Sequence, residues 1–188
     1  MKILVVGGVA AGAGAATKAR RTDENAEIII FEKGPYVSFA NCGLPYYVGG
    51  SIPDRDDLLL VSPELFRARF NIDVRINCEV TDVDAKGKTV HVKCQDAEYD
   101  ESYDKLILAM GGEPIAPKIP GVECDNVMNV FTVPDAERIV AALGGGVKSA
   151  VVVGGGFIGV ETAEGLAQRG IKTTLVEAQE QILGNIDP

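Results

Sequence analysis

The chain has 188 residues, of which 46% are hydrophobic and 24% are charged, and its formal net charge is -9. This length suffices for one domain, or one and a half small domains, with an apolar core. Because the chain is acidic, it has little nonspecific attraction for phosphate backbones, and we expect no nucleic-acid partner. Charged residues interrupt every long apolar run, and the run in MKILVVGG is too short for a signal peptide. We therefore expect no membrane span and a cytoplasmic protein.

In chain order, the first predicted elements form a strand-helix-strand unit. Residues 2–8 read as a buried strand stopped by glycines, residues 10–21 as a helix rich in alanine and glycine, and residues 27–33 as a second buried strand that ends in Glu32. A unit of about thirty residues with this order is typical of nucleotide-binding folds.

The middle of the chain is less regular. We predict a short helix over 62–70, a hairpin over 73–94 that turns at residues 86–88, a buried strand over 105–112, an irregular segment over 113–121, and a helix over 132–146 with Thr132 as N-cap and Pro134 in its first turn.

Residues 149–177 repeat the opening unit, with a strand, a helix and a strand that ends in Glu177. The fold class is therefore α/β, with two Rossmann-like dinucleotide-binding folds in tandem. We assign residues 1–115 to the first domain, with the hairpin as an insertion near 73–94, residues 116–147 to a connecting segment and helix, and residues 148–188 to the start of a second domain whose sheet is not completed.

A glycine motif follows the first strand of each unit. Gly154-Gly155-Gly156-Phe157-Ile158-Gly159 satisfies GxGxxG, and Glu177 follows Gly159 by 18 residues. Such glycines allow a tight turn and close approach of a pyrophosphate, while the acid reaches a ribose hydroxyl. The alternative is a glycine turn without a ligand. The first copy, residues 7–12, has Val9 in place of the middle glycine, but Glu32 follows Gly12 by 20 residues.

The cysteines do not form a recognisable pair. They lie at positions 42, 78, 94 and 124, without a CxxC motif, and the one histidine is His91. This spacing argues against a metal site and a two-cysteine redox centre. We also expect no disulfide framework. We interpret Cys78, Cys94 and Cys124 as structural and His91 as an ordinary strand residue.

Cys42 lies in SFANCGLPYYVGG, residues 38–50. Taken alone, it could be a small buried hydrophobic residue in a tight turn. Together with VVGGVAAG, YDKLILAMGG and VVVGGGFIGVETAE, however, this segment resembles the pyridine nucleotide-disulfide oxidoreductase superfamily. The resemblance runs through all 188 residues and is strongest to the single-cysteine branch that contains the coenzyme A disulfide reductases.

This resemblance implies a glutathione-reductase-like fold with its C-terminal half missing. It also implies FAD as cofactor, NADH or NADPH as cosubstrate, a homodimeric parent protein, and coenzyme A disulfide or a related small disulfide or persulfide as substrate. Cys42 would be catalytic, and no metal is expected. The substrate residues would be Lys18, Arg21, Ser38 and Asn41. The cofactor-binding residues would be Gly7, Gly8, Ala10, Ala11, Gly12, Glu32, Lys33, Asn41, Gly111, Gly154, Gly156, Phe157, Ile158, Gly159, Glu161 and Glu177.

Several alternatives stay open. An NADH oxidase or peroxidase would cycle Cys42 through a sulfenic acid, but similar peroxidases carry a histidine where this chain has Ala10. A noncatalytic FAD-binding fragment is a further alternative, and we expect the 188 residues alone to be inactive. Lys18 and Arg21 could instead complement a helix C-terminus and face water, as Glu164 could on its own helix. Glu177 favours NADH over NADPH without deciding between them.

Overall fold

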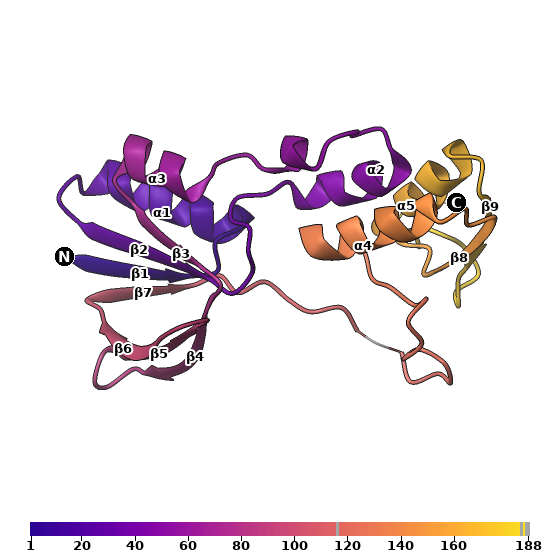
Figure 1. Ribbon diagram of the computed structural model, residues 1–188. Helices are drawn as coiled ribbons and strands as arrows, with labels where there is room; N and C mark the ends of the chain where they lie inside the picture. Colours follow the sequence, from indigo (N-terminus) through magenta and orange to yellow (C-terminus); the bar gives the residue numbers. More distant parts are fainter. Residues whose placement is uncertain (116, 185, 187–188) are drawn as a thin grey trace. The chain divides into compact units, whose positions relative to one another are not determined.

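The computed structural model describes the chain except for residues 116, 185, 187 and 188. It consists of two compact units, in which the second includes a segment from the first half of the sequence (Figure 1). The first unit comprises Met1–Phe39 and Leu59–Gly112, and the second comprises Ala40–Leu58 and Glu113–Pro188. The two units divide between Gly112 and Glu113, near the predicted domain boundary at residue 115. Residues 40–58, which include Cys42, were predicted to lie in the first domain but group with the second unit.

The first unit is built on a parallel sheet. Its elements are β1 (Lys2–Val6), α1 (Ala10–Thr22), β2 (Glu27–Glu32), α3 (Pro63–Phe70), β3 (Asp73–Ile76), β4 (Cys78–Asp84), β5 (Thr89–Cys94), β6 (Glu98–Ser102) and β7 (Lys105–Leu108). Four strands lie in the order β3-β2-β1-β7, and every pairing is parallel. The near-continuous apolar runs of β1 and β2 suit this sheet because both of its faces are covered.

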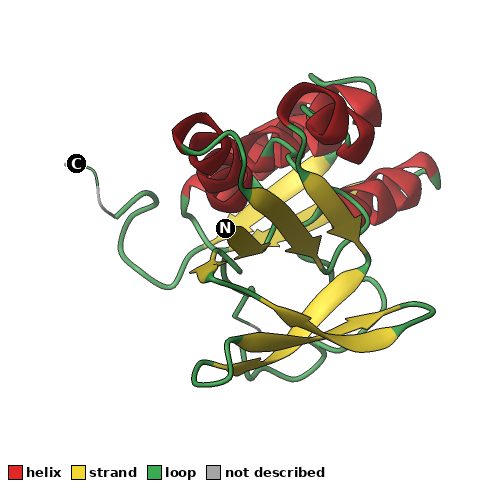
Figure 2. Cartoon of the chain, turned by 90° about the vertical axis from the view of Figure 1, so that its left-hand side faces the viewer, coloured by secondary structure: helices red, strands yellow, loops and turns green. Residues whose placement is uncertain are grey.

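The two faces of the parallel sheet carry different layers (Figure 2). Helices α1 and α3 pack on one face, against a core that includes Val5, Ile30 and Phe66. The antiparallel sheet β4-β5-β6 packs on the other, against Leu4 and Phe31. Each fully buried side chain of this size contributes about 1.5–3 kcal/mol. This two-sided burial fixes the end of β1, where the first glycine turn begins.

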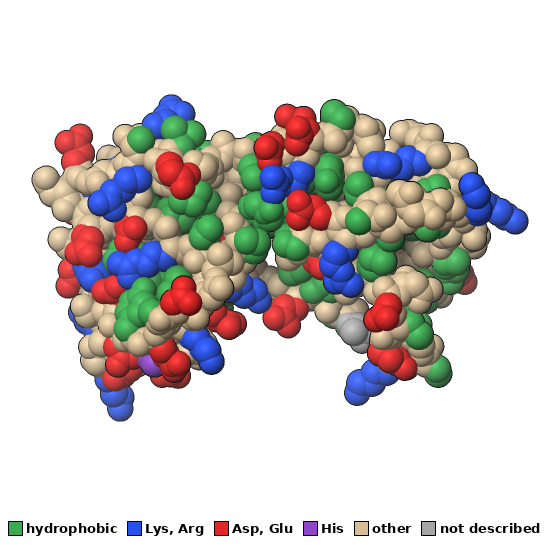
Figure 3. Space-filling model, in the orientation of Figure 1, with side chains coloured by type: hydrophobic (Ala, Val, Ile, Leu, Met, Phe, Trp, Pro, Cys, Tyr) green, Lys and Arg blue, Asp and Glu red, His purple; other side chains and the backbone are tan. Residues whose placement is uncertain are grey.

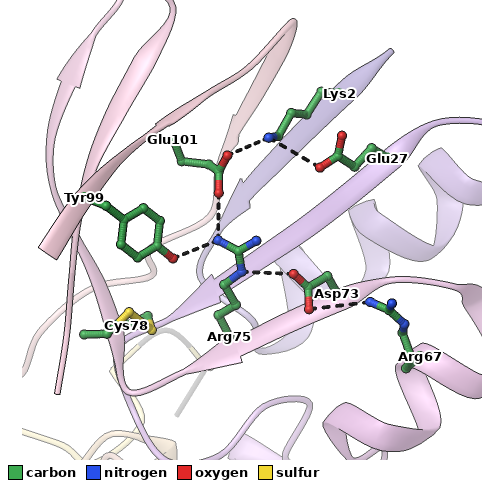
Figure 4. Close-up of polar contacts among 9 residues, drawn as sticks. Lys2, Glu27, Arg67, Asp73, Arg75, Cys78, Tyr99 and Glu101 are labelled. Atoms are coloured by element: carbon green, nitrogen blue, oxygen red, sulfur yellow. Dashed lines mark hydrogen bonds and ion pairs between the residues drawn. A yellow bond between two sulfur atoms is a disulfide. The ribbon is translucent and has the colours of Figure 1, made fainter. Parts of the chain in front are cut away.

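A polar network joins the antiparallel sheet to the parallel one (Figure 4). Arg75 of β3 donates to Glu101 of β6 at 2.7 Å and to the Tyr99 hydroxyl at 2.8 Å. Lys2 Nζ donates to the other oxygen of Glu101 at 2.5 Å. Burial raises the pKa of Glu101, but the hydrogen bonds from Lys2 and Arg75 outweigh burial and hold this pKa below its ordinary value. The network therefore fixes β6 against the edge of the unit by charge-assisted hydrogen bonds.

The expected hairpin over residues 73–94 was wrong in its first residues, and a strand after it was missed. Residues Asp73–Ile76 do not belong to the hairpin, because they pair with β2 as a parallel strand, and the strand β6 was not predicted. The hairpin proper is β4–β5, and its register places Cys78 opposite Cys94, where a disulfide joins them. The expected absence of disulfides failed because the hairpin brings together two residues that lie 16 positions apart.

The second unit contains the other helices and a two-stranded sheet. Its elements are the 3-10 helix η1 (Asn41–Gly43), α2 (Leu44–Gly49), the 3-10 helix η2 (Arg55–Leu58), α4 (Val133–Gly144), β8 (Ser149–Val153), α5 (Phe157–Gln168) and β9 (Lys172–Val176). Strands β8 and β9 are parallel, and α5 packs on them and on α2. Helix α4 begins with the predicted N-cap, because Thr132 and Asp135 form a reciprocal capping box.

The surface shows no separation of charge on the side drawn in Figure 3, where acidic and basic side chains are interspersed over the first unit. Among the residues that the structure describes, no helix is both long enough and apolar enough to cross a bilayer.

Candidate functional site

The first glycine turn connects β1 to α1. Gly7 has φ of +94°, and a Cβ on it would lie 2.2 Å from the carbonyl oxygen of Ala109, so another residue would be strained there. A Cβ on Gly12 would lie 1.7 Å from the carbonyl oxygen of Gly7, so the first turn of α1 lies directly against the backbone of the loop. Helix α1 has no acidic residue in its first turn and no side-chain cap, which leaves its N-terminal amides open to a phosphate.

Glu32 stands beside this turn at the end of β2. Its side chain is buried, with the residue 8% exposed, and its two oxygens accept hydrogen bonds from the backbone amides of Gly8 at 2.7 Å and Gly34 at 2.8 Å. The carboxylate is therefore held at the carboxyl end of the sheet, where dinucleotides bind in open α/β folds. Gly111, predicted to contact the same cofactor, follows β7 with φ of +71°.

The second glycine turn repeats this arrangement. Gly154 has φ of +106°, and a Cβ on Gly159 would lie 1.9 Å from the carbonyl oxygen of Gly154. The Glu177 carboxylate accepts from the amides of Gly155 at 2.6 Å and Gln179 at 2.8 Å. Hydrogen bonds from the backbone, first from Gln179 and then from Gly155, hold the pKa of Glu177 below its ordinary value.

The substitution of valine for the middle glycine does not disturb the first turn. Val9 is the N-cap of α1, at the position that Gly156 takes before α5. Each turn therefore keeps the same geometry and the same clamp between an acid and a backbone amide, although only the second satisfies the full motif. Sequence comparison of the two copies could not show this, because the shared features are backbone hydrogen bonds.

A cavity of about 370 Å³ lies beside the second turn, within the range of small-molecule sites. The residues that line it are Gly155, Gly156, Glu177, Gln179, Gln181, Leu183 and Gly184. The segment after β9 folds over the turn, and the Leu183 amide donates to the Gly155 carbonyl at 2.8 Å. Sequence reasoning missed Gln179 and Gln181, for which nearness to Glu177 in the chain is the one available signal.

The Cys42 segment begins in the first unit and enters the second. Ser38 has a left-handed backbone, with φ of +50°, and its amide donates to the carbonyl of Gly8 at 2.9 Å. A non-glycine residue held in this conformation costs about 1–3 kcal/mol, and such residues cluster at functional sites. Cys42 follows in η1, with Asn41 before it, as an exposed free thiol. Its exposure contradicts the alternative of a small buried hydrophobic residue.

Cys124 is also free and exposed, so exposure does not single out Cys42. What distinguishes Cys42 is its surroundings. Before Cys42, the backbone of Ser38 is fixed by its hydrogen bond to Gly8. After Cys42, Gly43 packs so closely that a Cβ on it would lie 2.7 Å from the Leu58 side chain. Cys124 lies in a loop between β7 and α4.

The predicted substrate cations lie on the exposed surface of α1. Lys18 and Arg21 are both exposed. Arg20, by contrast, has a structural task, because its guanidinium donates to the carbonyls of Phe70 at 2.8 Å and Asn71 at 2.9 Å at the end of α3. Lys18 and Arg21 therefore stay predictions, and the structure accounts for Arg20 without a ligand.

The two acids of α5 differ in surroundings. Glu161 is half-buried and accepts a hydrogen bond from the Tyr46 hydroxyl at 3.2 Å, a contact that sequence reasoning missed. Glu164 is exposed and accepts from the side chain of Gln168 at 3.2 Å, as expected of a solvated helix face.

Comparison with known proteins identifies the family of the chain. The family model described as pyridine nucleotide-disulphide oxidoreductase matches residues 1–188. The chain is 38% identical over 184 residues to a coenzyme A disulfide reductase of Staphylococcus haemolyticus, which covers 96% of this chain and 41% of that protein. It is 35% identical over 193 residues to an NADH oxidase of Methanocaldococcus jannaschii, which covers 100% of this chain and 43% of that protein.

Among solved structures, reduced CoADR-RHD of Bacillus anthracis superposes with a TM-score of 0.96 at 47% identity. That match covers 99% of this chain and 34% of the other. The chain thus spans less than half the length of each of these three proteins. The family model, in contrast, matches the chain from end to end, and the chain belongs to the pyridine nucleotide-disulphide oxidoreductase family.

Proposed function

We propose that this chain forms the N-terminal part of a flavoprotein oxidoreductase that reduces coenzyme A disulfide, or a related small disulfide or persulfide, with NADH. The observation that supports this most strongly is the duplication of one clamp. The same glycine turn and the same acid-to-amide hydrogen bonds occur twice, at Glu32 and at Glu177, in a chain that also carries a free and exposed thiol at Cys42.

The first turn fits FAD. The open amides at the start of α1 suit a pyrophosphate, and the close contact of Gly12 with Gly7 leaves the backbone accessible where a side chain would block it. One carboxylate oxygen of Glu32 accepts a hydrogen bond from the Gly8 amide and the other accepts one from the Gly34 amide. Each oxygen keeps a second lone pair that can accept from a ribose hydroxyl. When bound, FAD would accept a hydride from the nicotinamide and pass two electrons to a disulfide at Cys42.

The second turn fits a nicotinamide dinucleotide, and we infer that NADH is preferred. The residues that line its cavity include no lysine or arginine to neutralise a 2'-phosphate, and Glu177 would repel one. NADPH would bring two negative charges to the side of the ribose where this carboxylate is held.

Cys42 supplies the covalent chemistry. Its thiolate attacks one sulfur of the disulfide, a new bond forms between Cys42 and one coenzyme A, and the other coenzyme A leaves as a thiolate. Two electrons then cleave the mixed disulfide, which returns the Cys42 thiolate and releases the second coenzyme A. The two thiol products take up two protons, one that arrives with the hydride of NADH and one from solvent. The absence of a second cysteine near Cys42 in the sequence suits this cycle, because the substrate provides the partner sulfur.

The similarity to an NADH oxidase favours one alternative, in which Cys42 cycles through a sulfenic acid. Stopped-flow kinetics separate the two. We expect the full-length, FAD-loaded enzyme that contains this chain, after anaerobic reduction with NADH, to be reoxidised faster by coenzyme A disulfide than by hydrogen peroxide. Cys42→Ser should abolish the reaction with the disulfide while FAD stays bound, and Cys124→Ser should not. Faster reoxidation by peroxide would instead support the alternative.

A further inference from the structure

Helix α2, which follows Cys42, lies in close contact with α5, which follows the second glycine turn. Three residues spaced four apart, two in α5 and the third its C-cap Arg169, take part in this contact. A Cβ on Gly165 would lie 2.6 Å from the Gly49 Cα, so the two backbones touch without a side chain between them. One turn later, the Arg169 guanidinium donates to the Tyr47 carbonyl at 3.4 Å. One turn earlier, Glu161 accepts from the Tyr46 hydroxyl at 3.2 Å.

The hydrogen bond between Tyr46 and Glu161 has a defined direction. The bond to Glu161, with the charges of Glu161, Glu164 and Cys42, raises the pKa of the Tyr46 phenol above its ordinary value. The phenol therefore keeps its proton at neutral pH and acts as the donor.

Glu161 is well placed to face a bound dinucleotide. It lies four residues after Phe157, the first residue of α5, and the N-terminus of this helix faces the pyrophosphate in the proposed complex. If Glu177 holds the adenosine ribose, the nicotinamide end would extend to another side of the helix N-terminus. Passage of electrons towards Cys42 would place that end on the side of α5 that contacts α2.

We infer that Tyr46 is a positioning residue for hydride transfer, whose hydroxyl holds the Glu161 carboxylate beside the nicotinamide. The inference rests on the proposed function in that the second turn must bind a nicotinamide dinucleotide. A glutamate side chain that is free to rotate loses conformational entropy when it is fixed. The Tyr46 hydroxyl provides this order in advance. A fixed carboxylate then stabilises the positive charge that the nicotinamide ring gains as it gives up a hydride.

The test is the rate at which NADH reduces the flavin of the FAD-loaded enzyme, measured anaerobically by stopped flow. Tyr46→Phe removes the hydroxyl and keeps the ring, and Tyr47→Phe, on the same helix, is the matched control. We expect Tyr46→Phe to slow reduction about 5-fold to 10-fold, as for the loss of one typical, solvent-accessible hydrogen bond. Tyr47→Phe should change the rate less than about 2-fold.

A double-mutant cycle with Glu161→Gln separates positioning from independent effects. If the hydroxyl acts through Glu161, the double variant should be no slower than Glu161→Gln. Thermal stability and the rate of reoxidation by coenzyme A disulfide should stay unchanged in Tyr46→Phe, because a purely structural role would alter both. Multiplicative losses in the double variant, or equal rates for Tyr46→Phe and Tyr47→Phe, would overturn the inference.

The readout also distinguishes this inference from the proposed function. Flavin reduction by NADH is measured before any acceptor is added, so reoxidation by peroxide in place of a disulfide would overturn the proposed substrate and leave the role of Tyr46 supported. A wild-type enzyme whose flavin NADH does not reduce would overturn both. Slow reduction of Tyr46→Phe together with lowered thermal stability and slow reoxidation would show a structural role and overturn the inference alone.

Discussion

Glu32 and Glu177 illustrate how one side chain can serve a turn and a ligand together. Each carboxylate offers about four lone-pair directions. In each case one oxygen accepts a hydrogen bond from an amide of the glycine turn. The other oxygen accepts from the backbone amide of the residue two positions after the glutamate itself. The acid is thus ordered before a ribose arrives, which lowers the entropic cost of binding. Burial differs, since Glu32 is buried and Glu177 only partly so.

At the residue scale, the surface cations provide a test of the substrate. If Lys18 and Arg21 bind phosphates of coenzyme A, replacement of both by alanine should raise KM for coenzyme A disulfide about 10-fold, while a small disulfide without phosphates is little affected. The effect should shrink at high salt, because these side chains are exposed. Lys86 and Lys118, exposed cations elsewhere, give a control with the same change in charge. Equal losses for both disulfides would show that the two cations act structurally.

At the scale of elements, α1 contains two glycines with opposite requirements. A Cβ on Gly12 would collide with the Gly7 carbonyl, whereas a Cβ on Gly14 would meet no atom within 4 Å. We expect Gly12→Ala to destabilise the protein by about 1–3 kcal/mol and to weaken FAD binding. Gly14→Ala should stabilise it by up to about 1 kcal/mol, because alanine is the better helix former. Chemical denaturation and FAD titration of both variants test this pair, and equal FAD affinities would contradict it.

The strand pair β5–β6 carries a pH-dependent contact. The ring nitrogens of His91 lie 2.7 Å from an oxygen of Asp100 and 2.8 Å from one of Glu98. These hydrogen bonds, to Asp100 first, raise the pKa of His91. A raised folded-state pKa means that the contribution to stability is complete below the unfolded value, about 6.5, and is lost as pH rises through the folded value.

The corresponding measurement is the Tm of the protein and of His91→Asn across this pH range. The advantage of the wild type over the variant should be largest in mild acid and should decline above about pH 6.5. A difference in Tm that stays constant or grows with rising pH would contradict the assignment. The effect should be small, because Glu98 and Asp100 are exposed and His91 is only half-buried.

The same elements show what a sequence can and cannot predict. The strands β1, β2, β8 and β9 and the helices α1, α4 and α5 follow from apolar runs, glycine stops and caps such as Thr132, which are local signals. The placement of Asp73–Ile76 beside β2, the Cys78–Cys94 pair and the Tyr46–Glu161 contact depend on partners distant in sequence. No local pattern encodes these partners, so the sequence alone could not predict them.

At the scale of the whole molecule, the two units differ in completeness. The parallel sheet of the first unit is covered on both faces. In the second unit, Val151 and Val153 of β8 are 65% and 67% exposed, on the face of the two-stranded sheet opposite α5. Parallel sheets normally have both faces covered. We therefore expect that the 188 residues on their own do not sustain turnover. Steady NADH-dependent reduction of coenzyme A disulfide by these residues alone, at about 1 per second or more, would contradict this expectation.

The central claim, that Cys42 forms a mixed disulfide which NADH reduces through FAD, is tested most directly by mass spectrometry of the FAD-loaded enzyme. After treatment with coenzyme A disulfide, the peptide that contains Cys42 should carry one coenzyme A, and one equivalent of NADH added without oxygen should release it. Coenzyme A on Cys124 in place of Cys42, or an adduct on Cys42 that NADH does not remove, would contradict the account.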